Sequence, residues 1–101
     1  MKYSLIVNPH GGVKSGLKIL EKVKPFFEEA DADLNIIETE YAGHARDIAS
    51  EVPLDGFTGL CAIGGDGTMH EMVNGMMNRK DGRQIPIGLI TGGTGNSFMH
   101  D

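Results

Sequence analysis

Hydrophobic positions along the chain fall into short apolar runs that alternate with longer repeats. The short runs predict strands at Tyr3–Val7, Leu34–Thr39, Gly59–Ile63 and Ile85–Ile90. Between them, apolar residues recur three and four positions apart, which predicts amphipathic helices at Lys14–Glu29, Ala42–Val52 and Thr68–Asn78. Strands that alternate with helices form parallel βαβ units. The pattern therefore predicts an α/β fold of three layers, a mostly parallel sheet with helices on both faces.

Two glycine-rich loops follow the third and fourth predicted strands. The first reads Gly64-Gly65-Asp66-Gly67-Thr68, and the second covers Thr91–Ser97. In an open α/β sheet the carboxyl ends of parallel strands lie at one edge, and ligands bind outside that edge. We therefore expect both loops to meet Asn8, which follows the first strand, at a single site.

The first loop has the composition of a phosphate site. Three glycines without Cβ atoms let the backbone bring N–H groups close to an anion, and a following helix adds its unpaired amides and its dipole. Asp66 conflicts with simple phosphate binding, because a carboxylate repels phosphate unless a cation lies between them or a substrate proton is transferred. Two structural alternatives stay open: Asp66 as a turn residue, and Thr68 with Glu71 as a capping box.

Composition and charge narrow the functional classes. The 101 residues suit one compact domain, and a net charge of -5 without a basic run argues against binding to nucleic acid or unaided binding to a membrane. The single cysteine, Cys61, lies in an apolar run and is expected to be a buried thiol. No apolar stretch approaches the roughly 18 residues of a membrane span, and the first residues do not form a signal peptide. A cytoplasmic protein is expected.

Several familiar motifs are absent. Lys14-Ser15 follows Val13 instead of the glycine of a Walker A loop, and neither glycine loop has the spacing or position of a dinucleotide fingerprint. The four histidines lack the paired spacing of a zinc site. Of these, His44 is expected to pack or cap near the start of the second helix.

Four motifs, taken in order and spacing, resemble the catalytic domain shared by diacylglycerol kinases, sphingosine kinases and their bacterial lipid-kinase relatives. They are Asn8-Pro9 with Gly11-Gly12, Thr39 with Gly43-His44-Ala45, Gly64–Thr68 with Glu71 and Asn74-Gly75, and Gly93-Thr94-Gly95-Asn96. The resemblance spans nearly the whole chain. NAD kinases and phosphofructokinases share the Gly-Gly-Asp-Gly loop, whereas the Asn-Pro start and the Gly-His-Ala segment favour the lipid kinases.

The resemblance implies transfer of the γ-phosphoryl group from ATP to the hydroxyl of a diacylglycerol- or sphingosine-like lipid, with Mg²⁺ as the metal. It implies that Asp66 is catalytic, either as a holder of Mg²⁺ or as the general base. The implied nucleotide contacts are Asn8, Thr39, Gly64, Gly65, Asp66, Gly67, Thr68, Met69, His70, Glu71, Thr94 and Asn96. No separate set of metal ligands is predicted within the chain.

The resemblance also implies that residues 1–101 are the nucleotide-binding half of a longer enzyme. A mostly β second domain would complete the lipid cleft and contribute further Mg²⁺ ligands, so this chain alone is expected to be inactive. Lipid access and transient membrane contact would belong to the full enzyme, and a homodimer stays open. Two alternatives remain: an NAD kinase-like phosphotransferase, and a nucleotide-binding module without catalysis.

Overall fold

A computed structural model describes residues 1–8 and 16–90 of the chain. Its elements, in chain order, are β1 (Lys2–Val7), α1 (Gly16–Glu29), β2 (Asp33–Glu38), α2 (His44–Glu51), β3 (Gly59–Ile63), α3 (Asp66–Met77) and β4 (Ile87–Ile90). The strands form one parallel sheet in the order β2-β1-β3-β4. The predicted α/β fold with a parallel sheet is confirmed.

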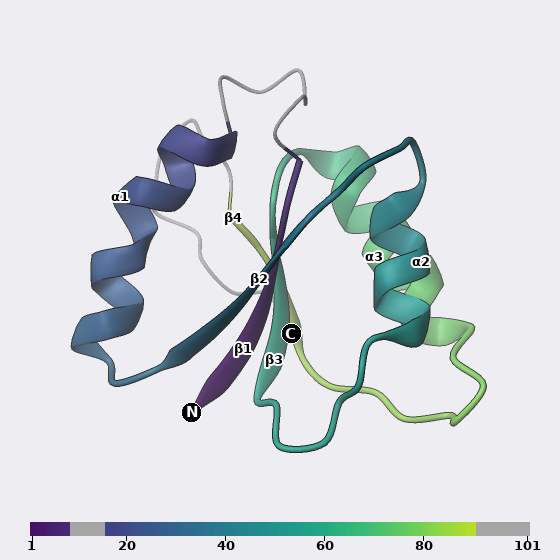
Figure 1. The fold of residues 1–101 in the computed structure, drawn as a ribbon. Helices are drawn as coiled ribbons and strands as arrows, with labels where there is room; N and C mark the ends of the chain where they lie inside the picture. The colour runs from purple at the N-terminus through teal and green to yellow at the C-terminus, as the bar shows by residue number, and fades with distance from the viewer. Residues whose placement is uncertain (9–15, 91–101) are drawn as a thin grey trace.

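The helices cover both faces of the sheet, with α1 on one side and α2 and α3 on the other (Figure 1). Alternate residues of β1 divide accordingly: Leu5 and Val7 pack with Leu20 and Val23 of α1, while Ile6 belongs to the core under α2 and α3. From β1 the chain crosses to β2, and from β3 it crosses the other way to β4. Because crossovers between parallel strands share one handedness, these opposite directions place α1 and α3 on opposite faces of the sheet. The carboxyl ends of β1 and β3 thus form the topological switch point of the sheet.

Backbone geometry at single residues sets the element boundaries that differ from prediction. The second helix begins at His44 instead of Ala42, because Gly43 has a φ of 86°, which a right-handed helix does not contain. The fourth strand begins at Ile87 instead of Ile85, because Pro86 has no N–H to donate. The carbonyl of Pro86 still accepts a hydrogen bond from Leu60 at 3.0 Å.

The third helix begins two residues earlier than predicted, at Asp66. Gly65 is its N-cap, in an extended conformation with φ -112°, and no side chain makes a capping hydrogen bond. The capping-box interpretation of Thr68 and Glu71 is therefore wrong, since Thr68 already lies within the first turn and donates its N–H to the Gly65 carbonyl at 3.1 Å. A carboxylate in the first turn is stabilised by the helix dipole, which favours the early start.

Helices α2 and α3 approach each other closely at Gly75. A Cβ at this position would overlap the carbonyl oxygen of Arg46 and lie 2.8 Å from the Cβ of Ala49. Only glycine allows the two backbones to come this near. Gly75, which the sequence analysis cited only as part of a family motif, is therefore a packing residue.

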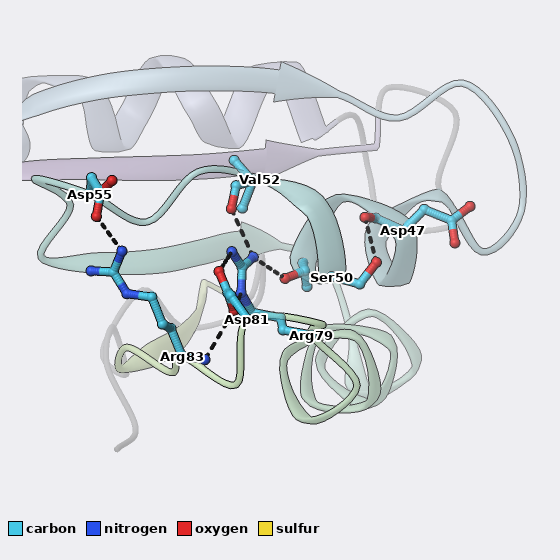
Figure 2. Close-up of polar contacts among 8 residues, drawn as sticks. Asp47, Ser50, Val52, Asp55, Arg79, Asp81 and Arg83 are labelled. Carbon is cyan, nitrogen blue, oxygen red and sulfur yellow. Dashed lines mark hydrogen bonds and ion pairs between the residues drawn. The ribbon is translucent and has the colours of Figure 1, made fainter.

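A buried arginine joins the far ends of the same two helices (Figure 2). The side chain of Arg79 is 5% exposed and donates hydrogen bonds to the carbonyls of Ala49 at 3.0 Å and Val52 at 2.7 Å. Its guanidinium also pairs with Asp81, whose carboxylate accepts a further bond from the N–H of Arg83 at 2.9 Å. Arg79 thus satisfies carbonyls at the end of α2 that have no partner within the helix. The network therefore holds α2 and α3 together at their C-terminal ends, away from the sheet edge at which both helices begin.

No helix within residues 1–8 and 16–90 combines the length and hydrophobicity that crossing a membrane requires.

Candidate nucleotide-binding site

The first glycine loop connects β3 to α3 at the carboxyl edge of the sheet. Gly64 donates its N–H to the carbonyl of Ile90 at 3.1 Å, which ties the loop to β4. The N–H groups of Thr68 and Met69 both donate to the carbonyl of Gly65, at 3.1 and 3.2 Å. The amides of residues 65–67 precede these first intrahelical bonds, and such amides point outward from a helix start. They form a ready site for an anion.

Two glycines of this loop are not explained by the fold itself. A Cβ at Gly65 or Gly67 would meet no described atom within 4 Å, and neither residue has a positive φ. At Gly64, by contrast, a Cβ would lie 2.5 Å from the Thr68 hydroxyl oxygen. Packing therefore requires glycine at position 64, whereas no residue in the described part of the chain occupies the space directly over the backbone at positions 65 and 67. A phosphate needs such space to reach backbone amides.

Asp66 lies between these two glycines as the first residue of α3, and its side chain is exposed. An accessible carboxylate at the rim of an anion site can bind a cation that is shared with phosphate, or can accept a proton. The geometry fits either role predicted for Asp66.

A second part of the site lies where β1 and β2 end. A pocket of about 250 Å³ is lined by Asn8, Thr39, Glu40, Tyr41 and Ala42. Thr39 donates its N–H to the carbonyl of Val7 at 2.9 Å, so the parallel ladder continues one residue past β2. This bond holds Thr39 beside the end of β1. The structure thus brings Asn8 and Thr39, two of the predicted contacts, into one pocket.

Tyr41 is a pocket residue that the sequence analysis missed. Its hydroxyl donates to Asp47 at 2.7 Å, and its ring stacks on His44 with centroids 4.3 Å apart and planes 19° from parallel. The hydrogen bond to Asp47 raises the pKa of Tyr41 above its usual value. His44 Nδ1 in turn accepts a bond from the N–H of Glu40 at 2.9 Å, which confirms the prediction that His44 packs near the helix start. An aromatic residue two positions past Thr39, between the predicted strand and the predicted helix, was the available signal.

The pocket and the glycine loop lie along the same edge. Val7 at the end of β1 pairs with Glu38 of β2 on one side and with Ile63 of β3 on the other. Two strand spacings, about 10 Å, therefore separate the end of β2 from the start of the glycine loop. Both α2 and α3 also begin at this edge, so the positive ends of two helix dipoles face it.

The remaining predicted nucleotide contacts lie either further along α3 or outside the described residues. Met69 packs its side chain against the core and already donates its N–H to Gly65. His70 is exposed on α3, and Glu71 is half-buried. Thr94 and Asn96, with the rest of the second glycine loop, lie outside the described residues, as does the segment from Pro9 to Ser15.

No three His, Cys, Asp or Glu side chains gather as a metal site within the described ranges. A larger pocket of about 310 Å³ lies between α1 and the sheet. Its lining is Met1, Tyr3, Phe26, Phe27, Ala30, Ala32, Cys61 and Ile90. These side chains are almost wholly apolar and offer no charged group to a phosphate, so this pocket does not compete with the glycine loop as a nucleotide site.

Comparison with known proteins identifies the family. The family described as "Diacylglycerol kinase catalytic domain" matches residues 2–101. The chain belongs to this family. It is 41% identical over 99 residues to sphingosine kinase 2 of Arabidopsis thaliana, and 38% identical over 98 residues to sphingosine kinase 1 of Mus musculus. These matches cover 94% and 93% of the chain but only 21% and 26% of the two relatives.

Solved structures of the same family share the fold. Two solved diacylglycerol kinase structures from Bacillus anthracis are 32% and 31% identical to the chain, with TM-scores of 0.69 and 0.70. Each comparison covers 92% of this chain and 33% of the solved one. The chain thus spans about a third of these kinases, and the predicted membership of the diacylglycerol and sphingosine kinase family is confirmed.

Proposed function

We propose that this chain is the nucleotide-binding half of an ATP-dependent lipid kinase, which transfers the γ-phosphoryl group of ATP to a diacylglycerol- or sphingosine-like hydroxyl. Membership of the family supports kinase chemistry, and the relatives carry the names of sphingosine kinases and a diacylglycerol kinase. The observation that carries the proposal is the space over Gly65 and Gly67 at the start of α3, which none of residues 1–8 and 16–90 fills.

In this proposal the glycine loop holds the phosphates of ATP. The amides of residues 65–67 donate to phosphate oxygens, and the dipole of α3 stabilises their charge. Phosphoryl transfer depends mainly on positioning and on stabilising charge in the transition state, so these backbone groups suit it without a covalent nucleophile. Asn8 and Thr39 hold the part of the nucleotide that lies toward β2.

Asp66 is the residue proposed to connect binding with chemistry. Mg²⁺ in kinases is usually held by one or two carboxylates together with substrate phosphates, and it neutralises charge on the phosphate oxygens when bound. One exposed carboxylate beside the phosphate site fits that requirement, and it also fits acceptance of the hydroxyl proton. The lipid pocket and further ligands would come from a β-rich domain beyond these residues.

Phosphate transfer by the full-length protein tests the proposal. With radiolabelled ATP and Mg²⁺, label is expected in diacylglycerol or in sphingosine. Label in NAD alone would favour the NAD kinase-like alternative. Calorimetric titration of the same protein with ATP adds a second test, because absence of binding at millimolar ATP would remove the proposed nucleotide site.

Asp66→Asn tests the chemical role separately from binding. Turnover should fall by about 10²- to 10⁴-fold, as is typical when an acid–base group is removed. ATP binding without Mg²⁺ should persist, because the amides remain. Asp55→Asn is the matched control, since Asp55 is an exposed carboxylate that precedes β3, at the opposite end of the sheet. Equal turnover of the two variants would exclude both roles of Asp66.

A further inference from the structure

Tyr41 combines high exposure with a fixed position. The residue is 56% exposed, yet its hydroxyl bonds Asp47 and its ring stacks on His44. His44 itself is held by the N–H of Glu40. These contacts order a large aromatic side chain on the surface, although ordering a side chain costs entropy and exposure of its ring brings little hydrophobic gain. The arrangement is explained if another molecule covers the ring.

The ring borders the pocket that Asn8 and Thr39 also line. Because His44 stacks on one side of the ring and more than half of the residue is exposed, one aromatic surface is accessible to a ligand. Besides Glu40 and Ala42, the lining includes an aromatic residue, an amide and a hydroxyl. Binding sites for small molecules typically combine apolar surface with a few such polar groups that set orientation. A planar heteroaromatic ring matches this combination best.

The position relative to the phosphate site identifies that heteroaromatic ring. About 10 Å, two strand spacings, lie between the end of β2 and the glycine loop. An extended nucleotide places its base and its terminal phosphates at opposite ends over such a span. With the phosphates at residues 65–67, the base falls at the end of β2. We infer that Tyr41 is the base-stacking residue, fixed in place by His44 and Asp47. This inference rests on the proposed ATP site.

Titration of the full-length protein with two ligands tests this role. ATP carries a base, whereas inorganic tripolyphosphate carries only the phosphates. Tyr41→Ala should weaken ATP binding by about 5- to 150-fold, the range for loss of one base–aromatic stack. Binding of tripolyphosphate should stay unchanged, since the amides of residues 65–67 are intact. Tyr41→Phe is the matched control: it keeps the ring, loses the bond to Asp47, and should retain most of the ATP affinity.

The outcomes separate this inference from the proposed function. If the unaltered protein binds neither ligand, the ATP site itself is wrong. If the unaltered protein binds ATP and Tyr41→Ala binds it equally well, only the stacking role is overturned. If Tyr41→Ala loses equal affinity for ATP and for tripolyphosphate, Tyr41 only supports the structure of the turn and the stacking role is overturned. An equally large loss in Tyr41→Phe would assign the effect to the hydroxyl and also overturn stacking.

Discussion

The hydroxyl oxygen of Thr68 lies 2.5 Å from the point where a Cβ on Gly64 would stand, and the Thr68 Cβ lies 3.0 Å from it. Gly64 is buried, and its N–H is bonded to Ile90. The contact joins the residue that follows β3 to the first turn of α3. A methyl group on Gly64 has no room there. Gly64 therefore sets the distance between the sheet and the helix that presents its amides to the proposed phosphate site.

Gly64→Ala should destabilise the fold by about 1–3 kcal/mol, the usual cost of an extra methyl group in a filled interior. Thr68→Ala removes the closest atom, so the double variant should recover part of that loss. Chemical denaturation of the four proteins measures the coupling. Strictly additive effects of the two substitutions would contradict the proposed steric contact.

Gly67→Ala should have opposite effects on stability and on binding. Position 67 is in the first turn of α3, and a Cβ there would meet no atom of the described residues within 4 Å. Alanine forms helix better than glycine by up to about 1 kcal/mol. The thermal midpoint without ligand should rise slightly. ATP affinity should fall, because the methyl group occupies the space proposed for phosphate. Unchanged ATP affinity in a stabilised variant would show that phosphate does not approach this glycine.

Gly75→Ala supplies the contrast within the same helix. Its Cβ would overlap the carbonyl oxygen of Arg46, so this variant should lower the thermal midpoint. The same chemical change in α3 thus has opposite expected effects on stability at positions 67 and 75, which separates helix propensity from packing.

The helices and strands could be predicted because the burial of each one produces a local pattern of apolar residues in the sequence. All five residues of β3 are buried, and a short continuous apolar run is the pattern of a strand covered on both faces. Asn8 and the first glycine loop were expected at one edge because parallel strands present their carboxyl ends together, and the structure places both there, whereas Thr39 was predicted only through the family resemblance. The order of alternating elements was sufficient for that inference.

Features that depend on contacts between distant residues could not be predicted. Arg79 bonds the carbonyl of Ala49, which is 30 positions away, and nothing local to either residue marks the pairing. The start of α3 at Asp66 depends on the extended backbone of Gly65, which competes with an equally plausible cap at Thr68. Tyr41 became a pocket residue only once the fold placed its turn beside Asn8.

Arg79→Met should destabilise the protein by about 2–4 kcal/mol, because two carbonyls and a carboxylate lose a donor that is almost fully buried. Methionine keeps much of the side-chain volume and removes the charge. Arg83→Met is the matched control: Arg83 pairs with Asp55, but both side chains are exposed, at 52% and 85%, so little change is expected. Equal unfolding midpoints of the two variants would contradict the structural role of Arg79.

The Asp81 carboxylate should make stability depend on pH in the acid range. Its hydrogen bond to Arg79, and then the bond from the Arg83 N–H, lower the pKa of Asp81 from 3.8 to about 2. A pKa that is lower in the folded state adds stability that is complete above about pH 4 and is lost as the pH falls toward 2. Asp81→Asn should flatten that part of the profile, measured as the urea midpoint at each pH. An unaltered slope between those values would show that Asp81 does not contribute to it.

Cys61 should resist alkylation while the protein is folded. The residue is 0% exposed in β3, a central strand, and burial raises the pKa of the Cys61 thiol to about 11. Since the thiolate is the reactive form, both access and ionisation oppose reaction at pH 8. Iodoacetamide labelling of the peptide that contains Cys61, followed by mass spectrometry, should show modification only in denaturant. Rapid labelling in native buffer would mean that β3 opens locally, which would contradict a rigid sheet beneath the glycine loop.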